Sequence, residues 1–365
     1  MFKRKRYIRL FFKALFISTL LLFVTTAIGV YGWFYVNNTI SPPKVPNIPI
    51  VAIQPNSPLH GSSSSDPSSS NSGTAAHYDL YDELQQPELM QFEERKPNFF
   101  TFLLFGLTEG NHANTIMVAA YDADARQGYI ISIPRDTRVD FQRSRRKIVN
   151  AYPFGFSGGR GHDGGVERMI YEASTLIGFR PDFYISINYE AFISLVDMIG
   201  GVEVNVPFHM RYDDPYQNLH INIPAGLQLL DGYNALHFAR YRMGNDRRQT
   251  ISDYQRIEHQ QQVLSAVTRE LLTPASVLRI PEFINIFNTY VDSNLTVGNL
   301  TWLASQARHI GGLDSLHMYT LPMLGTSGAP FWYELADEVG IIELVNRTIN
   351  PLVRDITSND LRIAL

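Results

Sequence analysis

The chain has 365 residues, 45% of them hydrophobic, which is enough to bury a full core in one large domain or two ordinary ones. Its formal net charge of -4 and pI near 6.2 argue against non-specific nucleic-acid binding, which requires a basic excess. The chain has no cysteine, and this excludes disulfides, thiolate metal sites and cysteine nucleophiles.

The N-terminus has the pattern of a signal anchor. Residues 1–13 form a basic segment, and an uncharged apolar run follows at 14–36. That run is about the length a helix needs to cross a membrane, and basic flanks stay in the cytoplasm. A cleaved signal peptide is the alternative, but its apolar region is usually shorter and no A-x-A site follows. We therefore expect a single-pass membrane protein whose remaining residues are extracellular.

Residues 37–97 have the composition of an extracellular tether. The stretch from 41 to 74 is rich in Pro and Ser and has too little apolar material to fold. A polar, partly helical approach is expected from 78 to 96.

The pattern from 98 to 365 predicts a domain of interleaved strands and helices. Short apolar runs that indicate strands lie at 101–106, 115–121, 128–133, 183–187 and 202–206. Longer patterns with helical periodicity lie at 165–177, 189–199, 253–272 and 300–309. This alternation is typical of a layered α/β sandwich.

A charged pair follows the third of these strands, in the segment Ile131–Asp136 (ISIPRD). Pro134 ends the strand, so Arg135 and Asp136 are expected at its mouth, where loops build functional sites. The alternative is a plain surface ion pair.

Two arginines alternate in the segment Ala235–Arg242 (ALHFARYR), which follows the turn signal Asp231-Gly232. In an extended segment, Arg240 and Arg242 would project from one face. Two adjacent guanidinium groups suit a pyrophosphate better than a single carboxylate. The alternative is an exposed edge with solvated charge.

Three polar residues share one face of the predicted helix that begins at Asp253. Asp253, Arg256 and Gln260 stand at spacings of three and four, with Asp253 near the favourable N-terminal end. An ordinary helix surface has the same spacing.

The segment Gly155–Gly159 matches the G-x-S-x-G pattern of serine hydrolases. That mechanism needs a strand directly before the serine and a helix directly after it. Here a Pro-containing segment precedes Ser157 and a glycine-rich loop follows, so we do not expect a nucleophile. The ten histidines show no zinc-ligand spacing.

The order of these motifs resembles the LytR-CpsA-Psr family over nearly all of residues 98–350. The matching segments are LLFG, NTIMVAAYD, IISIPRDTRV, Lys147–Gly159, FYISINYEAFISLVDMIGGVEVNVP, GLQLLDGYNALHFARYR and DYQRIEHQQQVL. The anchor and tether are also usual in the family. The resemblance implies a three-layer α/β/α sandwich with a mixed central sheet.

The resemblance also implies an activity in cell-wall biogenesis. Family members hold a polyprenyl chain in a hydrophobic pocket and its pyrophosphate at an arginine-rich mouth, and transfer the lipid-linked glycan with one phosphate to a peptidoglycan hydroxyl. Such chemistry depends mainly on positioning and charge stabilisation. By motif match, the expected phosphate-binding residues are Arg135, Arg240, Arg242 and Arg256. The expected catalytic residues are Arg135, Asp253 and Gln260, the last two by orienting the arginines or the acceptor.

The sequence departs from the family at its metal ligands. The resemblance implies Mg²⁺ held by two aspartates, but their positions carry Thr108 and Asn114. Neutral oxygens are poor ligands for magnesium, which is normally held through at least one carboxylate. Glu109 is adjacent and is a possible substitute. His259 stands where the family often has arginine.

Two hypotheses follow for the function. The first is a membrane-anchored phosphotransferase that attaches a teichoic acid, capsule or related glycopolymer to peptidoglycan, with weakened or altered metal dependence. The second is a non-catalytic module that binds polyprenyl-pyrophosphate-linked glycans. A third, transcriptional attenuation, survives in the family's naming, but an extracellular domain without a basic DNA-reading element argues against it.

Overall fold

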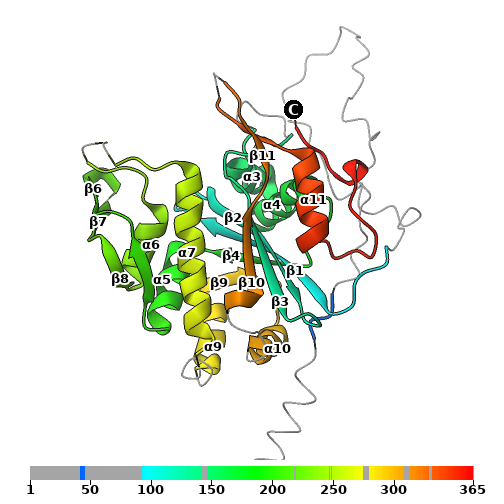
Figure 1. The fold of residues 1–365 in the computed structure, drawn as a ribbon, viewed down its shortest axis with the longest axis horizontal. Helices are drawn as coiled ribbons and strands as arrows, with labels where there is room; N and C mark the ends of the chain where they lie inside the picture. Colours follow the sequence, from blue (N-terminus) through cyan, green and yellow to red (C-terminus); the bar gives the residue numbers. More distant parts are fainter. Residues whose placement is uncertain are drawn as a thin grey trace, which may run out of the picture.

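A six-stranded mixed β-sheet forms the centre of the molecule in the computed structural model (Figure 1). The structure describes residues 42–45, 93–140, 146–217, 219–245, 247, 249–273, 279–307, 313–328 and 331–364. The strands are β1 (Phe99–Leu107), β2 (Ala113–Asp122), β3 (Gln127–Ser132), β4 (Phe183–Ile187), β9 (Val291–Ser293) and β10 (Leu316–Thr320). Their order is β10-β3-β2-β1-β4-β9. The pairs β10–β3 and β1–β4 are parallel, and the other pairs are antiparallel.

Helices cover both faces of this sheet. They are α3 (Ala151–Gly155), α4 (Gly161–Ile177), α5 (Tyr189–Met198), α6 (Gly232–Arg240), α7 (Asp253–Leu271), α9 (Ile280–Tyr290), α10 (Val297–Ala307) and α11 (Glu338–Thr348). Because side chains alternate along a strand, β1 sends Leu103 to the core under α4 and α11, and Phe102 to the core under α9 and α10. The expected three-layer α/β/α sandwich is confirmed.

A smaller lobe carries a third hydrophobic core beside the sheet. It contains two strand pairs, β5 (Val202–Val206) with β8 (Gly226–Leu230) and β6 (Met210–Asp214) with β7 (Leu219–Ile223). Val196 of α5, Phe238 of α6 and Val263 of α7 pack with these strands. The lobe therefore joins α5, α6 and α7 into one unit against the sheet.

A hairpin from the C-terminal third docks on the loop after β3. It consists of β11 (Met323–Thr326) and β12 (Glu334–Ala336). The Glu334 N–H donates to Asp136 O at 3.0 Å, and the Arg138 N–H donates to Glu334 O at 2.9 Å. These bonds fix the backbone on both sides of the loop that carries Arg135.

Helix α4 begins earlier than the pattern at 165–177 predicts. Its first five residues include Gly164 and Gly165, and a Cβ on Gly165 would lie 2.8 Å from the ring of Tyr152. The glycines that hide the helical pattern therefore allow α3 and α4 to approach closely.

The expected anchor at 14–36 and most of the expected tether lie outside the described residues. Within the part of the chain that the structure describes, no helix is long and apolar enough to cross a membrane.

Candidate functional site

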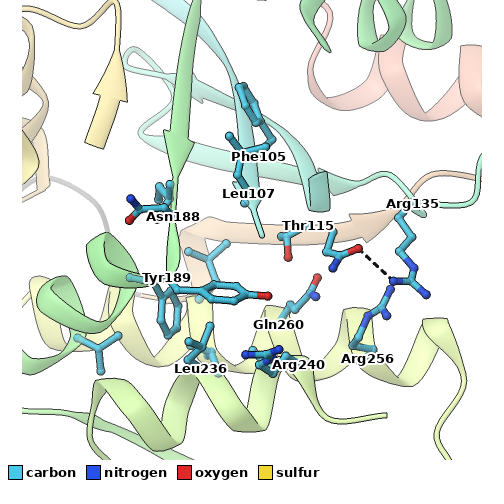
Figure 2. Close-up of a pocket in the computed structure, with 18 of the residues that line it drawn as sticks. Phe105, Leu107, Thr115, Arg135, Asn188, Tyr189, Leu236, Arg240, Arg256 and Gln260 are labelled. Atoms are coloured by element: carbon cyan, nitrogen blue, oxygen red, sulfur yellow. Dashed lines mark hydrogen bonds between the residues drawn. The ribbon is translucent and has the colours of Figure 1, made fainter. Parts of the chain in front are cut away.

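A cavity of about 490 Å³ lies between the ends of β1 and β4 and the helices α5, α6 and α7 (Figure 2). This volume is in the usual range for small-molecule sites. Much of its wall is apolar, including Leu104, Ile187, Phe192, Leu236, Leu264 and Val267. Its charged groups are all guanidinium groups, and the arginines that line it are Arg135, Arg240, Arg242 and Arg256. A cavity of this kind fits an anion attached to a hydrocarbon chain.

Arg135 lies at the mouth of β3, as its position after Pro134 predicts. Its Nε lies 3.2 Å from Asp253 Oδ2, and its Nη1 donates to Asn114 Oδ1 at 3.0 Å. Its distance to Asp136 is longer, at 4.0 Å, and Asp136 instead pairs with Lys147 at 3.1 Å. Arg135 is therefore oriented mainly by partners that are distant in sequence, and its ion pair with Asp136 is the longest of these contacts.

The predicted helical face at the start of α7 is present in the structure. A capping box between Ser252 and Gln255 starts the helix and places Asp253 in its first turn. Arg256 is buried and lies 3.2 Å from Asp253 Oδ1, while Gln260 lines the cavity one turn further. Arg256 and Gln260 thus face the ligand space, and Asp253 stands behind the arginines.

The arginine cluster, formed by Arg135, Arg242 and Arg256 around Asp253, carries a net positive charge. Burial raises the pKa of Asp253, but Arg256, Arg135 and Arg242 outweigh it and hold this pKa below its usual value. Burial and the nearby Arg135 lower the pKa of Arg256 to about 10, which still leaves it charged at neutral pH. Asp136 is the other nearby carboxylate, but it also pairs with Lys147, so the cationic groups still outnumber the carboxylates and the cluster favours an added anion.

The expected extended alternation of Arg240 and Arg242 is wrong. Arg240 is the last residue of α6, because Asp231 acts as a helix N-cap, accepting the Asn234 N–H at 2.9 Å, and not as part of a hairpin turn. Arg242 follows in irregular backbone. Both residues still line the cavity, and the Arg240 guanidinium lies over the ring of Tyr189, 4.7 Å from its centroid.

The positions expected to hold a metal do not fit a magnesium ion. Asn114 Oδ1 already accepts a hydrogen bond from Arg135, and a guanidinium so close repels a cation. Thr108 Oγ1 accepts the His112 N–H at 3.3 Å in the turn between β1 and β2, and Glu109 is exposed beside it. Among the described residues, no three His, Asp or Glu side chains gather closely enough to hold a metal ion.

Two residues near the cavity escaped prediction from the sequence. Tyr189, the first residue of α5, lines the cavity, and only its place after a strand end was a signal. His259 is buried and stacks on Phe238 with ring centroids 4.5 Å apart. Burial lowers the pKa of His259 to about 4, so this residue adds no charge at neutral pH, unlike the arginine usual in the family.

The G-x-S-x-G segment does not form a nucleophile elbow. Ser157 lies in a helical segment after α3, and its hydroxyl donates to Pro153 O at 2.8 Å. No strand directly precedes it in this described region, as the sequence predicts.

Comparison with known proteins adds a family and a set of relatives. The profile of the LytR_cpsA_psr family matches residues 66–344. The polyisoprenyl-teichoic acid–peptidoglycan teichoic acid transferase TagU of Oceanobacillus iheyensis is 26% identical over 72% of this chain and 78% of its own length. TagV of Bacillus subtilis, which has the same descriptive name, is 25% identical over 70% of this chain and 64% of its own. The regulatory protein MsrR of Staphylococcus aureus is 26% identical over 51% of this chain and 52% of its own.

Solved structures show the same fold. The crystal structure of B. subtilis TagV gives a TM-score of 0.57 at 20% identity, covering 69% of this chain and 96% of that one. A structure of TagT bound to LIIa-WTA gives a TM-score of 0.56 at 19% identity, covering 72% of this chain and 94% of that one.

Proposed function

Because the chain belongs to the LytR-CpsA-Psr family, we propose that it transfers a glycopolymer from a polyprenyl-pyrophosphate carrier to peptidoglycan. The names of TagU and TagV support this choice of donor and acceptor class. The observation that carries the proposal is one cavity with an apolar wall and four arginines in its lining.

The cavity suits an amphiphilic diphosphate in both of its parts. The apolar wall offers a long chain shelter from water, and the guanidinium groups match phosphate oxygens bidentately. Figure 2 shows Arg135, Arg256 and Gln260 gathered on one side of the cavity, with Arg240 beside them. We propose that the polyprenyl chain of the substrate lies along α5 and α7 and that its diphosphate lies among the arginines.

The reaction is a phosphoryl transfer. An acceptor hydroxyl forms a bond to the glycan-side phosphorus, and the bond from this phosphorus to the bridging oxygen breaks. The electron pair stays with polyprenyl phosphate, which takes up the proton that the hydroxyl loses. The glycan keeps one phosphate. The protein has no covalent step to perform, so its contribution is positioning and stabilisation of charge.

Each site residue has a part in this proposal. Arg135, Arg240, Arg242 and Arg256 bind the phosphate oxygens, which carry the growing charge. Asp253 orients Arg135 and Arg256 through its two contacts of 3.2 Å. Gln260 lines the cavity and orients the diphosphate or the acceptor.

The proposed reaction involves no step through magnesium. In relatives with two aspartates, the metal would supply positive charge to the diphosphate. Here Asn114 and Arg135 are hydrogen-bonded to each other, so a guanidinium supplies positive charge beside one of those positions.

The second candidate is a binding module that captures the same lipid-linked glycan without turning it over. The observation in its favour is the pairing of a neutral Asn114 with Arg135, because this leaves the diphosphate without a divalent cation. We further propose that residues 14–36 anchor the chain in the cell membrane with the domain outside.

The test is turnover of a lipid-linked pyrophosphate glycan by the purified chain, with peptidoglycan fragments as acceptor, with and without EDTA. Release of polyprenyl phosphate that depends on acceptor and resists EDTA supports the transferase. Tight binding without release supports the binding module. Absence of both binding and release contradicts the proposed function.

A further inference from the structure

The phenol of Tyr189 lies where the cationic and apolar parts of the cavity meet. Tyr189 is in the first turn of α5, and Phe192, Leu195 and Val196 of the same helix continue the cavity wall in its apolar part. On its other side, the ring lies beneath the Arg240 guanidinium, 4.7 Å from centroid to Cζ. This cation-π contact holds the ring in a fixed orientation.

The hydroxyl of Tyr189 is directed into the ligand space. Figure 2 shows the ring reaching across the cavity, with its oxygen pointing towards Gln260 and Arg240. Among the residues that the structure describes, Tyr189 Oη has no hydrogen-bond partner. A partly buried hydroxyl without a protein partner is available to a ligand.

This hydroxyl is a donor under ordinary conditions. Burial raises the pKa of Tyr189, and Arg240 only partly opposes this effect, while Glu109 adds to it. The phenol therefore stays protonated at neutral pH. Phosphate oxygens are acceptors, so a protonated phenol and a phosphate are complementary.

We propose that the Tyr189 hydroxyl donates a hydrogen bond to the phosphate that is joined to the lipid. The proposal rests on the proposed function. The polyprenyl chain would occupy the apolar part of the cavity, and the diphosphate would lie among the arginines. The lipid-side phosphate then lies at the boundary between these two parts, beside Tyr189. In the transfer this phosphate leaves with the electron pair of the broken bond, so its negative charge grows. A donor fixed at that point stabilises the transition state more than the ground state.

Tyr189→Phe tests the hydroxyl alone, because phenylalanine keeps the ring and its contact with Arg240. The matched control is Tyr129→Phe. Tyr129 lies on β3 outside the lining of the cavity, and its hydroxyl donates to Gln127 Oε1 at 2.5 Å. Both variants lose one oxygen from the same kind of side chain, but only Tyr189 faces the ligand space.

The measurements use the full chain in detergent. Binding is measured with farnesyl pyrophosphate and with farnesol, which has the same chain without phosphate. Turnover is measured with a short-chain polyprenyl-pyrophosphate glycan. Melting temperature checks that each variant folds. The ³¹P spectrum of bound farnesyl pyrophosphate reports the two phosphorus atoms separately.

We expect Tyr189→Phe to lower kcat by about tenfold to a hundredfold, the usual effect of losing a hydrogen bond to a charged group. KM and farnesol binding should change little, and the lipid-side ³¹P resonance should shift more than the terminal one. Tyr129→Phe, which lies outside the cavity, should match wild type in kcat, KM, farnesol binding and ³¹P shifts. An independent reading comes from wild type labelled with ¹³Cζ-tyrosine, in which farnesyl pyrophosphate should shift a tyrosine resonance that farnesol leaves unchanged.

Each other outcome overturns the assignment. If Tyr189→Phe has the same kcat and the same ³¹P shifts as wild type, the hydroxyl does not contact the phosphate. Equal losses in Tyr189→Phe and Tyr129→Phe would mean a general effect of removing a tyrosine hydroxyl, without a contact to the phosphate. If wild type binds neither farnesyl pyrophosphate nor the glycan substrate, the proposed function itself fails, which is distinguishable from failure at Tyr189 alone.

Discussion

Replacing Asp253 by asparagine tests whether this carboxylate acts as the internal counter-charge of the arginine cluster. Asp253 lies 3.2 Å from both Arg135 and Arg256, and its side chain is 23% exposed. Asparagine keeps the shape and some hydrogen bonding but removes the charge. Arg256, which is buried, is then left facing Arg135 and Arg242, with Asp136 as the remaining nearby carboxylate.

The expected cost follows from the geometry. The hydrogen bond from Arg135 to this carboxylate is worth about 1.5–3 kcal/mol, and the ion pair with Arg256 is not additive with it. Partial exposure of Asp253 screens the interaction, and the asparagine amide retains part of it. We therefore expect Asp253→Asn to lower the free energy of unfolding at neutral pH by about 2–3 kcal/mol, or roughly 4–12 °C in melting temperature.

The loss should depend on pH and on anions. The folded pKa of Asp253 is lowered from 3.8, so its contribution is present above about pH 4 and is lost as pH falls through the folded pKa. The gap between wild type and variant should therefore close in acid. At neutral pH, inorganic pyrophosphate should stabilise the variant more than wild type, because it replaces the missing negative charge.

The assay is thermal unfolding followed by circular dichroism, with and without pyrophosphate, from pH 3 to 8. The control is Asp140→Asn, which removes an exposed ion pair with Arg146 and should cost less than about 1 kcal/mol. Equal melting temperatures for wild type and Asp253→Asn, with equal stabilisation by pyrophosphate, would refute the counter-charge argument.

Three further predictions concern the same cavity. Arg240→Ala and Arg242→Ala should each weaken binding of a polyprenyl pyrophosphate by roughly tenfold or more at unchanged melting temperature, as measured by isothermal titration calorimetry; wild-type affinity in both would make them surface charge. The double change Thr108→Asp and Asn114→Asp should create measurable magnesium binding that wild type lacks, and in the binding-module hypothesis magnesium-dependent turnover as well. Tight magnesium binding by wild type would instead contradict the assignment of these positions. Leu264→Trp should fill the apolar part of the cavity and weaken binding of a long-chain lipid pyrophosphate much more than binding of inorganic pyrophosphate. Equal effects on both ligands would mean that the lipid chain binds outside this part of the cavity.

The sequence predicted most accurately those strands and helices whose signals lie in adjacent residues. The bounds of β4 and β5 match the expected runs, because their apolar residues are flanked by clear turn signals. The assignment of Arg240 to an extended segment failed for a local reason. Asp231-Gly232 fits both a hairpin turn and the start of a helix, and only the capping bond to Asn234 decides between them.

The residues of the site could be predicted from the sequence, but their arrangement in space could not. Arg135 and Asp253 are 118 positions apart, and no periodicity links them. The cavity wall also includes residues of strands β6 and β7, which the sequence pattern did not reveal as separate elements. Its shape follows from how the small lobe packs on the sheet, which is a property of tertiary structure.

The docking of the β11–β12 hairpin has a consequence for how the protein is made. The loop with Arg135 makes two of its backbone hydrogen bonds with Glu334, and the two edge strands of the sheet, β9 and β10, also come from the last quarter of the chain. Contacts of such long sequence separation form late in folding. A nascent or truncated chain therefore leaves β3 and β4 as unpaired sheet edges, and the loop with Arg135 without the hairpin, until its C-terminal part arrives, and during that interval it is most exposed to aggregation and proteolysis.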